Sequence, residues 1–279
     1  MDSTAASSRP ANPKESSVAI RFEDVWLGFE DKPVLRGLSF AVKTEETLVL
    51  LGETGTGKTL ALKLAAGLLC PDQGRVEALG QTVSGKTEEE LLGFRRQVGF
   101  VFQESALFDS LTVFENVAYR LQEEGVSEEE IRAKVQEVLR FVELENAGDL
   151  LSAELSGGMR RRVSIARALI TRPPIVLYDS PTAGLDPITS QTIITLILRL
   201  RDVYGVTALM ATHRLQDGFA LANFHFDPKA RRVRRGPPAE RVQPPITRFL
   251  VLRDGKTYFE GRPEEILNTK DAYLQRFLI

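Results

Sequence analysis

Short apolar runs alternate along the chain with longer segments in which apolar residues recur every three or four positions. The short runs are bounded by polar or glycine-rich residues, which is typical of buried strands. They are Thr47–Leu51, Val98–Phe102, Ile175–Asp179, Val206–Thr212 and Arg248–Leu252. Helix-forming segments lie between several of these runs, including residues 60–66, 127–145 and the stretch that ends at Leu200. Strands that alternate with helices predict an α/β fold.

Local turn and cap signals refine this pattern. The apolar positions between Ile20 and Val42 predict two strands joined by a turn at residues 30–33. Asp254-Gly255 lies between two later apolar runs and predicts a hairpin. Ser127, with Glu130 three residues later, is a capping-box signature for the helix that begins there. A short helix is expected at about residues 263–268.

Two stretches lack any periodicity. Residues 1–17 are rich in Ser, Ala and Pro, so we expect a disordered tail. Residues 227–248 are basic and rich in Pro and Gly, so we expect an exposed loop or insertion. That loop could contact anionic lipid headgroups, and an ordinary solvated loop is the alternative. The remainder, residues 18–279, is expected to form one domain.

Composition permits a large core and excludes some classes of partner. The chain has 279 residues, of which 43% are apolar, and its net charge of −2 favours neither nucleic acid nor a membrane surface. The single cysteine, Cys70, excludes an internal disulfide and suggests a reducing compartment. No apolar run approaches the roughly 18–20 residues that span a bilayer, and the N-terminus does not have the pattern of a secretory signal. We therefore expect a soluble, cytoplasmic protein.

The strongest chemical signal follows the run Thr47–Leu51. Residues 52–59 fit G-x-x-x-x-G-K-[ST], a phosphate-binding loop, with a strand before it and a helix after it. The glycines let several N–H groups point at one anion, and the helix N-terminus adds partial positive charge. Lys58 would reach the β- and γ-phosphates, and Thr59 would coordinate Mg²⁺. The expected nucleotide-binding residues here are Gly52, Glu53, Thr54, Gly55, Thr56, Gly57, Lys58 and Thr59. A glycine-rich turn that binds nothing is the alternative.

Polar or aromatic residues also stand at the ends of other predicted strands. Asp179 ends a buried run and is placed to hold Mg²⁺, directly or through water. Gln103 could offer its amide to a metal or to water, or it could be an ordinary loop residue. His213 is a site candidate, although a single histidine is more often structural. Phe29 could stack on a nucleotide base, or it could belong to the core.

A second glycine-rich helix start lies at Ser156, Gly157 and Gly158, where a helix N-terminus could bind another anion. Several arginines follow between positions 160 and 167, a run that invites a nucleic-acid interpretation. One short run on a nearly neutral chain is weak support for it, so a solvated helix face is favoured. No nucleic-acid partner is expected.

Taken together, these motifs resemble the nucleotide-binding domain of ATP-binding cassette (ABC) proteins, from about Ile20 to Gly261. That family has a phosphate loop, a glutamine loop, LSGG, a strand ending in Asp, a D-loop and a switch histidine, in this order. Here they are Gly52–Thr59, Gln103, Leu155–Gly158, Ile175–Asp179, Gly184–Pro187 and His213. The resemblance implies an α/β P-loop NTPase fold. Its mixed sheet core would carry a helical subdomain at about residues 91–165 and an antiparallel β subdomain.

The resemblance further implies an ATPase that binds ATP with Mg²⁺ in a head-to-tail dimer of two copies. ATP would lie between the phosphate loop of one copy and the LSGG of the other. Phe29 would stack on adenine, His213 would contact the γ-phosphate, and residues 103–119 would meet a transmembrane partner. The other implied nucleotide contacts are Ser156, Gly157, Gly158 and Asp186, and the implied metal contacts are Thr59, Gln103 and Asp179.

Finer similarity points to one branch of the family. The segments 103–108, 113–119, 155–159 and 186–189 resemble the ATPase of the bacterial Mla-type lipid transporters. Those systems pair the ATPase with an MlaE-like permease and an MCE-domain lipid-binding protein, and they move phospholipids or related lipids between the inner and outer membranes. The resemblance implies a peripheral location on the cytoplasmic face of the inner membrane. The transmembrane partner selects the cargo, so neither its identity nor the direction of transport can be deduced from this sequence.

Ser180 departs from the family pattern, because cassette ATPases normally have Glu directly after the strand Asp. That Glu positions and polarises the attacking water, whereas a serine hydroxyl is no base near pH 7. Glu104 is the nearest carboxylate among the motifs. Hydrolysis could be slow, the chain could bind ATP and barely hydrolyse it, or the serine could be an introduced substitution that traps the dimer. We expect slow turnover with ATP binding intact.

Two other function classes compete with a transporter subunit. Soluble cassette ATPases that act on ribosomes or DNA usually carry two cassettes or a long coiled-coil insertion. This chain has one phosphate loop, one LSGG and no heptad run, which argues against that class. The other alternative, motivated by Ser180, is a nucleotide-gated scaffold that does not hydrolyse ATP.

Overall fold

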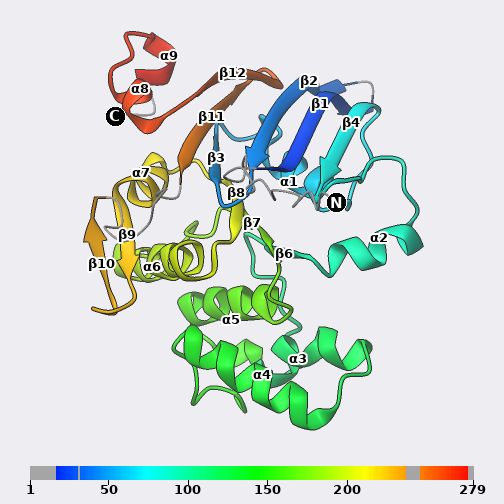
Figure 1. Ribbon diagram of the computed structural model, residues 1–279, viewed down its shortest axis with the longest axis vertical. Helices are drawn as coiled ribbons and strands as arrows, with labels where there is room; N and C mark the ends of the chain where they lie inside the picture. The colour runs from blue at the N-terminus through cyan, green and yellow to red at the C-terminus, as the bar shows by residue number, and fades with distance from the viewer. Residues whose placement is uncertain (1–16, 31, 237–245, 276–279) are drawn as a thin grey trace, which may run out of the picture.

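A six-stranded sheet runs through the centre of the protein (Figure 1). The computed structural model describes residues 17–30, 32–236 and 246–275. The strand order is β12-β11-β3-β8-β7-β6, and each neighbouring pair is parallel except the hairpin of β11 and β12. The strands are β3 Thr47–Leu51, β6 Val98–Val101, β7 Ile175–Asp179, β8 Thr207–Ala211, β11 Thr247–Arg253 and β12 Lys256–Gly261. The apolar runs therefore form strands as predicted, and Asp254-Gly255 is the turn of the predicted hairpin.

A second sheet, in the order β2-β1-β4-β5, is antiparallel throughout and packs against helix α1 (Lys58–Ala65). Its strands are β1 Val18–Phe29, β2 Lys32–Lys43, β4 Gln73–Ala78 and β5 Gln81–Thr82. The two strands predicted between Ile20 and Val42 pair with each other, and β1 ends just before a turn at Glu30. This sheet is the antiparallel β part of the expected fold.

Strand β3 separates two hydrophobic cores. Leu48 and Leu50 face a core built with α1 and the antiparallel sheet. Val49 and Leu51 face a core built with the helices on the other side. All four are fully buried. A strand that is covered on both faces needs an apolar residue at every position, which explains the unbroken run in the sequence.

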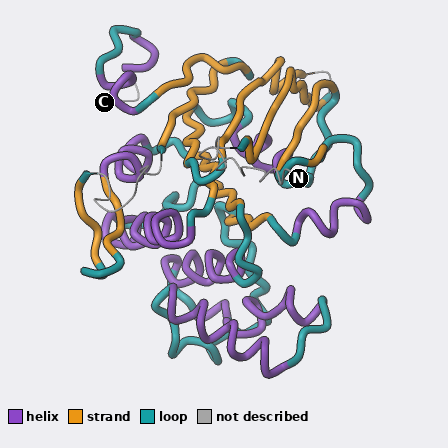
Figure 2. Tube along the Cα trace, viewed as in Figure 1, coloured by secondary structure: helices purple, strands orange, loops and turns teal. Residues whose placement is uncertain are grey.

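A helical layer lies below the main sheet, and Figure 2 shows its helices grouped together. It contains α3 Val113–Glu123, α4 Glu128–Phe141, the short 3-10 helix η1 Ser152–Glu154 and α5 Gly157–Leu169, whereas α2 Glu88–Arg95 lies apart from it. Ser127 caps α4 by accepting a hydrogen bond from the Glu130 N–H, and α4 ends before the predicted residue 145. Strand β6 lies inside the predicted helical range 91–165 but belongs to the main sheet, since Val98 and Val101 are buried beside β7.

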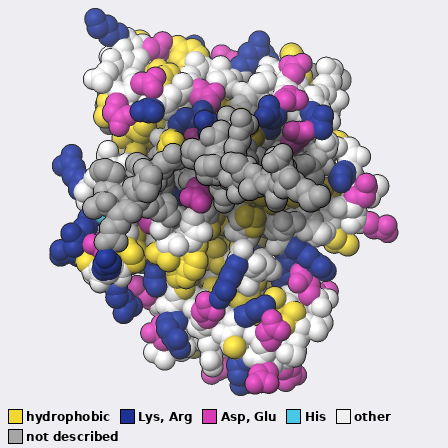
Figure 3. Space-filling model, in the orientation of Figure 1, with side chains coloured by type: hydrophobic (Ala, Val, Ile, Leu, Met, Phe, Trp, Pro, Cys, Tyr) yellow, Lys and Arg dark blue, Asp and Glu magenta, His cyan; other side chains and the backbone are white. Residues whose placement is uncertain are grey.

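The remaining helices are α6 Pro187–Tyr204, α7 Leu215–Asn223, α8 Pro263–Leu267 and α9 Ala272–Gln275. Beside α6 lies a hairpin of β9 Phe224–Asp227 and β10 Arg232–Arg235. The prediction of a loop over residues 227–248 is thus wrong in part. Strand β10 forms because its backbone pairs with β9 and Val233 packs against the core. The arginines of β10 stay exposed, as expected for this stretch. Figure 3 shows basic side chains gathered at this edge. Residues 237–245 and most of the predicted tail, residues 1–16, lie outside the described residues.

Candidate active site at the carboxyl ends of the parallel strands

The loop between β3 and α1 has a backbone that only glycine adopts without strain. Gly52, Gly55 and Gly57 have φ values of 152°, 85° and 97°. A Cβ on Gly57 would overlap the Leu35 side chain, and one on Gly52 would lie 2.7 Å from the Leu252 carbonyl oxygen. The chain therefore curls tightly before α1 begins, as the glycine spacing predicted.

Lys58 lies at the start of α1 and folds back over the loop. Its Nζ donates hydrogen bonds to the carbonyl oxygens of Gly52 and Glu53, both at 2.8 Å. Burial lowers the pKa of Lys58, and the nearby Asp179 carboxylate opposes that shift. The ammonium group of Lys58 is thus held over the glycine loop, where it would attract an anion.

Thr59 and Asp179 meet although they come from different elements. The Thr59 hydroxyl donates to Asp179 Oδ1 at 3.1 Å, which joins the first turn of α1 to the end of β7. Burial raises the pKa of Asp179, while the Thr59 hydrogen bond and the charges of Lys63 and Lys58 oppose the shift. A hydroxyl and a carboxylate beside a phosphate-binding loop are hard oxygen donors of the kind that Mg²⁺ prefers.

One cavity of about 310 Å³ brings together residues of four predicted motifs: the phosphate loop, the glutamine loop, the strand that ends in Asp and the switch histidine. It is lined by Val34, Thr54, Gly55, Gly57, Lys58, Thr59, Leu60, Gln103, Asp179, Ser180 and His213. Gln103, Asp179 and His213 stand at or just after the carboxyl ends of β6, β7 and β8, which are neighbours in the sheet. Parallel strands place such residues along one edge, and this is where ligands bind in α/β folds.

Ser180 lines this cavity directly after Asp179. Its side chain is buried, and its φ of 45° is unusual for a residue other than glycine. The Ser180 N–H donates to the Ala211 carbonyl at 2.8 Å, and the Ser180 carbonyl accepts from the Ala183 N–H at 3.0 Å. Among the described residues, Asp179 supplies the one carboxylate that lines the cavity, and Glu104 is not part of the lining.

Several predicted nucleotide contacts do not line this cavity, among them Gly52, Glu53 and Thr56 of the phosphate-binding loop. Phe29 is 52% exposed at the end of β1. Ser156 accepts a hydrogen bond from the Met159 N–H and caps α5, with Gly157 and Gly158 in the first turn. Asp186 caps α6 by accepting from the N–H groups of Ile188 and Thr189, each at 3.0 Å. Both helix starts are exposed, so a second molecule could reach them.

The arginine run in α5 is not the solvated helix face that we favoured. Arg161 is only 4% exposed and donates to the carbonyl oxygens of Phe102 and Gln103. Arg160 donates to Asp109 at 2.7 Å, and Arg167 donates to the Ala106 carbonyl at 2.8 Å. These arginines hold the loop that follows β6, and no local sequence signal indicated this role.

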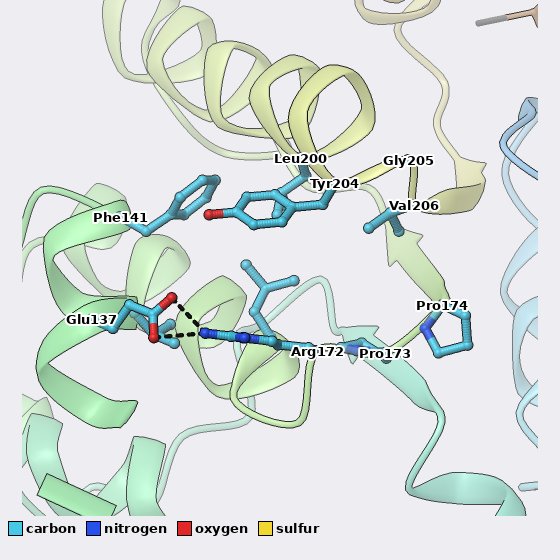
Figure 4. Close-up of a pocket in the computed structure, with 11 residues that line it drawn as sticks. Glu137, Phe141, Arg172, Pro173, Pro174, Leu200, Tyr204, Gly205 and Val206 are labelled. Atoms are coloured by element: carbon cyan, nitrogen blue, oxygen red, sulfur yellow. Dashed lines mark hydrogen bonds and ion pairs between the residues drawn. The ribbon is translucent and has the colours of Figure 1, made fainter. Parts of the chain in front are cut away.

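A second cavity, of about 340 Å³, lies away from the phosphate-binding loop (Figure 4). Phe141 on α4 and Tyr204 on α6 point into it from one side. Across from them Arg172 forms an ion pair with Glu137 at 2.7 Å. None of the predicted site residues lines it, so the chemistry belongs to the smaller cavity.

Comparison with known proteins agrees with this geometry. Residues 35–183 match the family model described as ABC transporter, which is more than half of the chain. The chain belongs to the ABC transporter family. It is an ATP-binding subunit of that family, an ATPase in which hydrolysis is coupled to transport. Among the described residues, none of the helices has both the length and the apolar character needed to cross a membrane.

Similar proteins of the family serve different cargoes. Protein TRIGALACTOSYLDIACYLGLYCEROL 3, chloroplastic, of Arabidopsis thaliana is 35% identical over 94% of this chain and 74% of its own length. Sulfate/thiosulfate import ATP-binding protein CysA of Synechococcus elongatus is 34% identical over 86% of this chain and 68% of its own. The intermembrane phospholipid transport system ATP-binding protein MlaF of Haemophilus influenzae is 31% identical over 89% and 85%. These identities establish the family without choosing its branch.

Solved structures confirm the predicted fold. The dimeric ATP-binding cassette MJ0796, in a post-hydrolysis state bound to ADP and phosphate, superposes with a TM-score of 0.72 at 28% identity. The match covers 87% of this chain and 98% of that chain. The expected α/β P-loop NTPase fold, with its mixed sheet, helices and antiparallel sheet, is the fold of this protein.

Proposed function

We propose that this chain energises a lipid transporter of the Mla type. The observation that carries the ATPase role is the single cavity shared by the phosphate-binding loop, Gln103, Asp179 and His213. Two of the similar proteins support the lipid cargo: one is named for intermembrane phospholipid transport and another for a galactolipid. The partners in this proposal are an MlaE-like permease and an MCE-domain lipid-binding protein, and the chain sits on the cytoplasmic face of the inner membrane.

Each site residue has a role in this proposal. ATP binds along Gly52, Glu53, Thr54, Gly55, Thr56, Gly57, Lys58 and Thr59, with Lys58 neutralising the β- and γ-phosphates. The oxygens of Thr59 and Gln103, with Asp179 directly or through water, would hold Mg²⁺, and the bound ion would spread the charge of the phosphates. His213 meets the γ-phosphate. Phe29 stacks on adenine, while Ser156, Gly157, Gly158 and Asp186 of a second copy close the site from the other side.

A groove beside the glutamine loop supports the permease contact. It has a volume of about 320 Å³, and Phe108 and Tyr119 on its lining are exposed, with ring centroids 4.9 Å apart. Phe100 and Phe102 stack at 4.1 Å in the same lining. Aromatic rings with exposed faces in a concave site are typical of protein-binding surfaces, and a short helix of the permease with an apolar anchor fits such a groove.

A photo-crosslinking amino acid at Tyr119 tests this contact in cell membranes. Tyr258 provides a matched control, because it is 40% exposed where Tyr119 is 42% exposed, and it lies on β12 outside the groove. We expect Tyr119 to capture a polytopic membrane protein and Tyr258 to capture none. Co-purification of a phospholipid-loaded MCE protein with that complex would support the lipid cargo. Capture of a sulfate or metabolite permease instead would contradict it.

We also propose that Ser180 makes hydrolysis slow without preventing ATP binding. The cavity holds Asp179 but lacks a second carboxylate among its described lining residues, so the attacking water has no obvious base. Positioning and charge stabilisation remain, and they supply most of the catalysis of phosphoryl transfer. A nucleotide-gated scaffold that binds ATP and barely hydrolyses it is the second candidate, favoured by the same serine.

A further inference from the structure

The loop that carries Gln103 is held in place by side chains of α5. Arg161 donates one guanidinium N–H to the Phe102 carbonyl and another to the Gln103 carbonyl. Arg161 is 4% exposed and both bonds are partly buried, which strengthens a charge-assisted hydrogen bond relative to one in water. A shift of the loop backbone away from α5 would therefore break these charge-assisted bonds.

Further along the same loop, Arg167 donates to the carbonyls of Ser105 and Ala106 at 3.1 and 2.8 Å. Ser105 and Ala106 have φ values of 64° and 47°, and two successive residues other than glycine in this region are costly. The backbone keeps this conformation because the surrounding contacts outweigh its cost. Contacts from α5 thus hold the loop in which Gln103 lies, beside the loop's own hydrogen bond from the Ser105 N–H to the Phe102 carbonyl at 3.0 Å.

Helix α5 begins at the second glycine-rich motif, LSGG. Ser156 caps it, and Gly157 and Gly158 form its first turn, so Arg161 lies about one helical turn further along. A rigid helix moves as a unit. Any displacement of its N-terminus is therefore passed through Arg161 to the backbone of Gln103.

We propose that Arg161 is a positioning residue for ATP hydrolysis: it sets the place of the Gln103 amide in the phosphate cavity and ties it to the N-terminus of α5. This rests on the proposed role of Gln103. The Arg161 guanidinium is a planar fork and serves two carbonyls at once, whereas a lysine ammonium is a single point charge. Both contacts go to backbone atoms, so they survive changes of the Gln103 side chain.

The chain offers a matched control on the same helix. Arg162 donates to the carbonyls of Val142 and Glu143, at 3.2 and 2.9 Å, after the end of α4. Arg162→Gln therefore removes an arginine with two carbonyl contacts but leaves the Gln103 loop alone. Unfolding temperatures of the variants will show how much stability each arginine contributes.

Single-turnover hydrolysis of radiolabelled ATP, with enzyme in excess, separates positioning from binding. We expect Arg161→Gln to lower the rate at saturating enzyme by about 10–100-fold, since small misplacements of a site residue cost that much. The half-saturating enzyme concentration should change less than about threefold, because the phosphate-binding loop is untouched. Arg161→Lys should recover part of the rate, and Arg162→Gln should match the parent. A normal rate in Arg161→Gln, or an equal loss in Arg162→Gln, would overturn the proposal.

A double-mutant cycle with Gln103→Ala identifies the route of the effect. If Arg161 acts through the Gln103 side chain, the double variant Arg161→Gln with Gln103→Ala should hydrolyse ATP at a rate within about threefold of that of Gln103→Ala alone. Losses that multiply would show that Arg161 acts elsewhere and would overturn the inference while sparing the proposed function. A normal rate in Gln103→Ala alone would instead remove the role assigned to Gln103, and the inference with it.

Discussion

At the scale of single residues, the glycines of the phosphate-binding loop differ in their surroundings. Gly55 and Gly57 both have positive φ, but a Cβ on Gly55 would meet open space, whereas one on Gly57 would overlap Leu35. Gly55→Ala should therefore show the backbone cost alone, about 1–3 kcal/mol. Gly57→Ala should lose about 1–3 kcal/mol more from overpacking. Urea unfolding of the two variants measures the difference, and equal losses would contradict the packing seen around Gly57.

Ser180 gives the second prediction at this scale. Ser180→Glu should raise the steady-state rate of hydrolysis by about 10²–10⁴-fold, because it supplies the missing general base beside the cavity. Ser180→Gln is the control of similar size without a charge, and it should stay near the parent rate. Equal rates for the parent and Ser180→Glu would mean that another group activates the water.

At the scale of elements, the apolar runs predicted the buried strands well. Strand β10 was missed because three of its four residues are arginines, which give no apolar pattern. Its conformation is fixed by backbone pairing with β9, which the local sequence does not show. The role of the α5 arginines was missed for a similar reason. Arg161 reaches carbonyls 58 and 59 positions away in the sequence, and no local pattern reports such a contact.

Helix α7 is tied to the turn after Ser180 by a buried carboxylate. Asp217 accepts hydrogen bonds from the Thr182 hydroxyl and, at 3.5 Å, from the Thr212 hydroxyl. Burial raises the pKa of Asp217, and the Thr182 hydrogen bond and Arg214 oppose the shift. The folded state therefore favours the protonated carboxyl. This contribution to stability is complete below the unfolded pKa, about 3.9, and is lost as the pH rises through the folded pKa.

The asparagine in Asp217→Asn cannot ionise, so this variant does not lose stability as the carboxyl of the parent ionises. The free energy of unfolding of Asp217→Asn, minus that of the parent, should increase from about pH 4 toward neutral pH. Urea unfolding at several pH values checks the sign. A flat difference would show that hydrogen bonds to the carboxylate offset its burial, and a difference that falls with rising pH would show that they outweigh it.

At the scale of the whole molecule, the fold explains why distant motifs share one cavity. Parallel strands β6, β7 and β8 end side by side, so Gln103, Asp179 and His213 gather around the loop after β3. The order of the motifs in the sequence was enough to predict this group. The contacts of all the predicted site residues with nucleotide and Mg²⁺ stay predictions, and Phe29, Ser156 and Asp186 do not line the cavity of the single chain.

The central claim is that the loop Gly52–Thr59 binds Mg²⁺-bound ATP through Lys58. Calorimetric titration of the purified chain with Mg²⁺-ATP, beside Lys58→Ala, tests it directly. The account predicts saturable binding by the parent and at least about tenfold weaker binding by Lys58→Ala, because a charge-assisted contact to the phosphates is lost. No binding by the parent, or equal binding by both proteins, would contradict it.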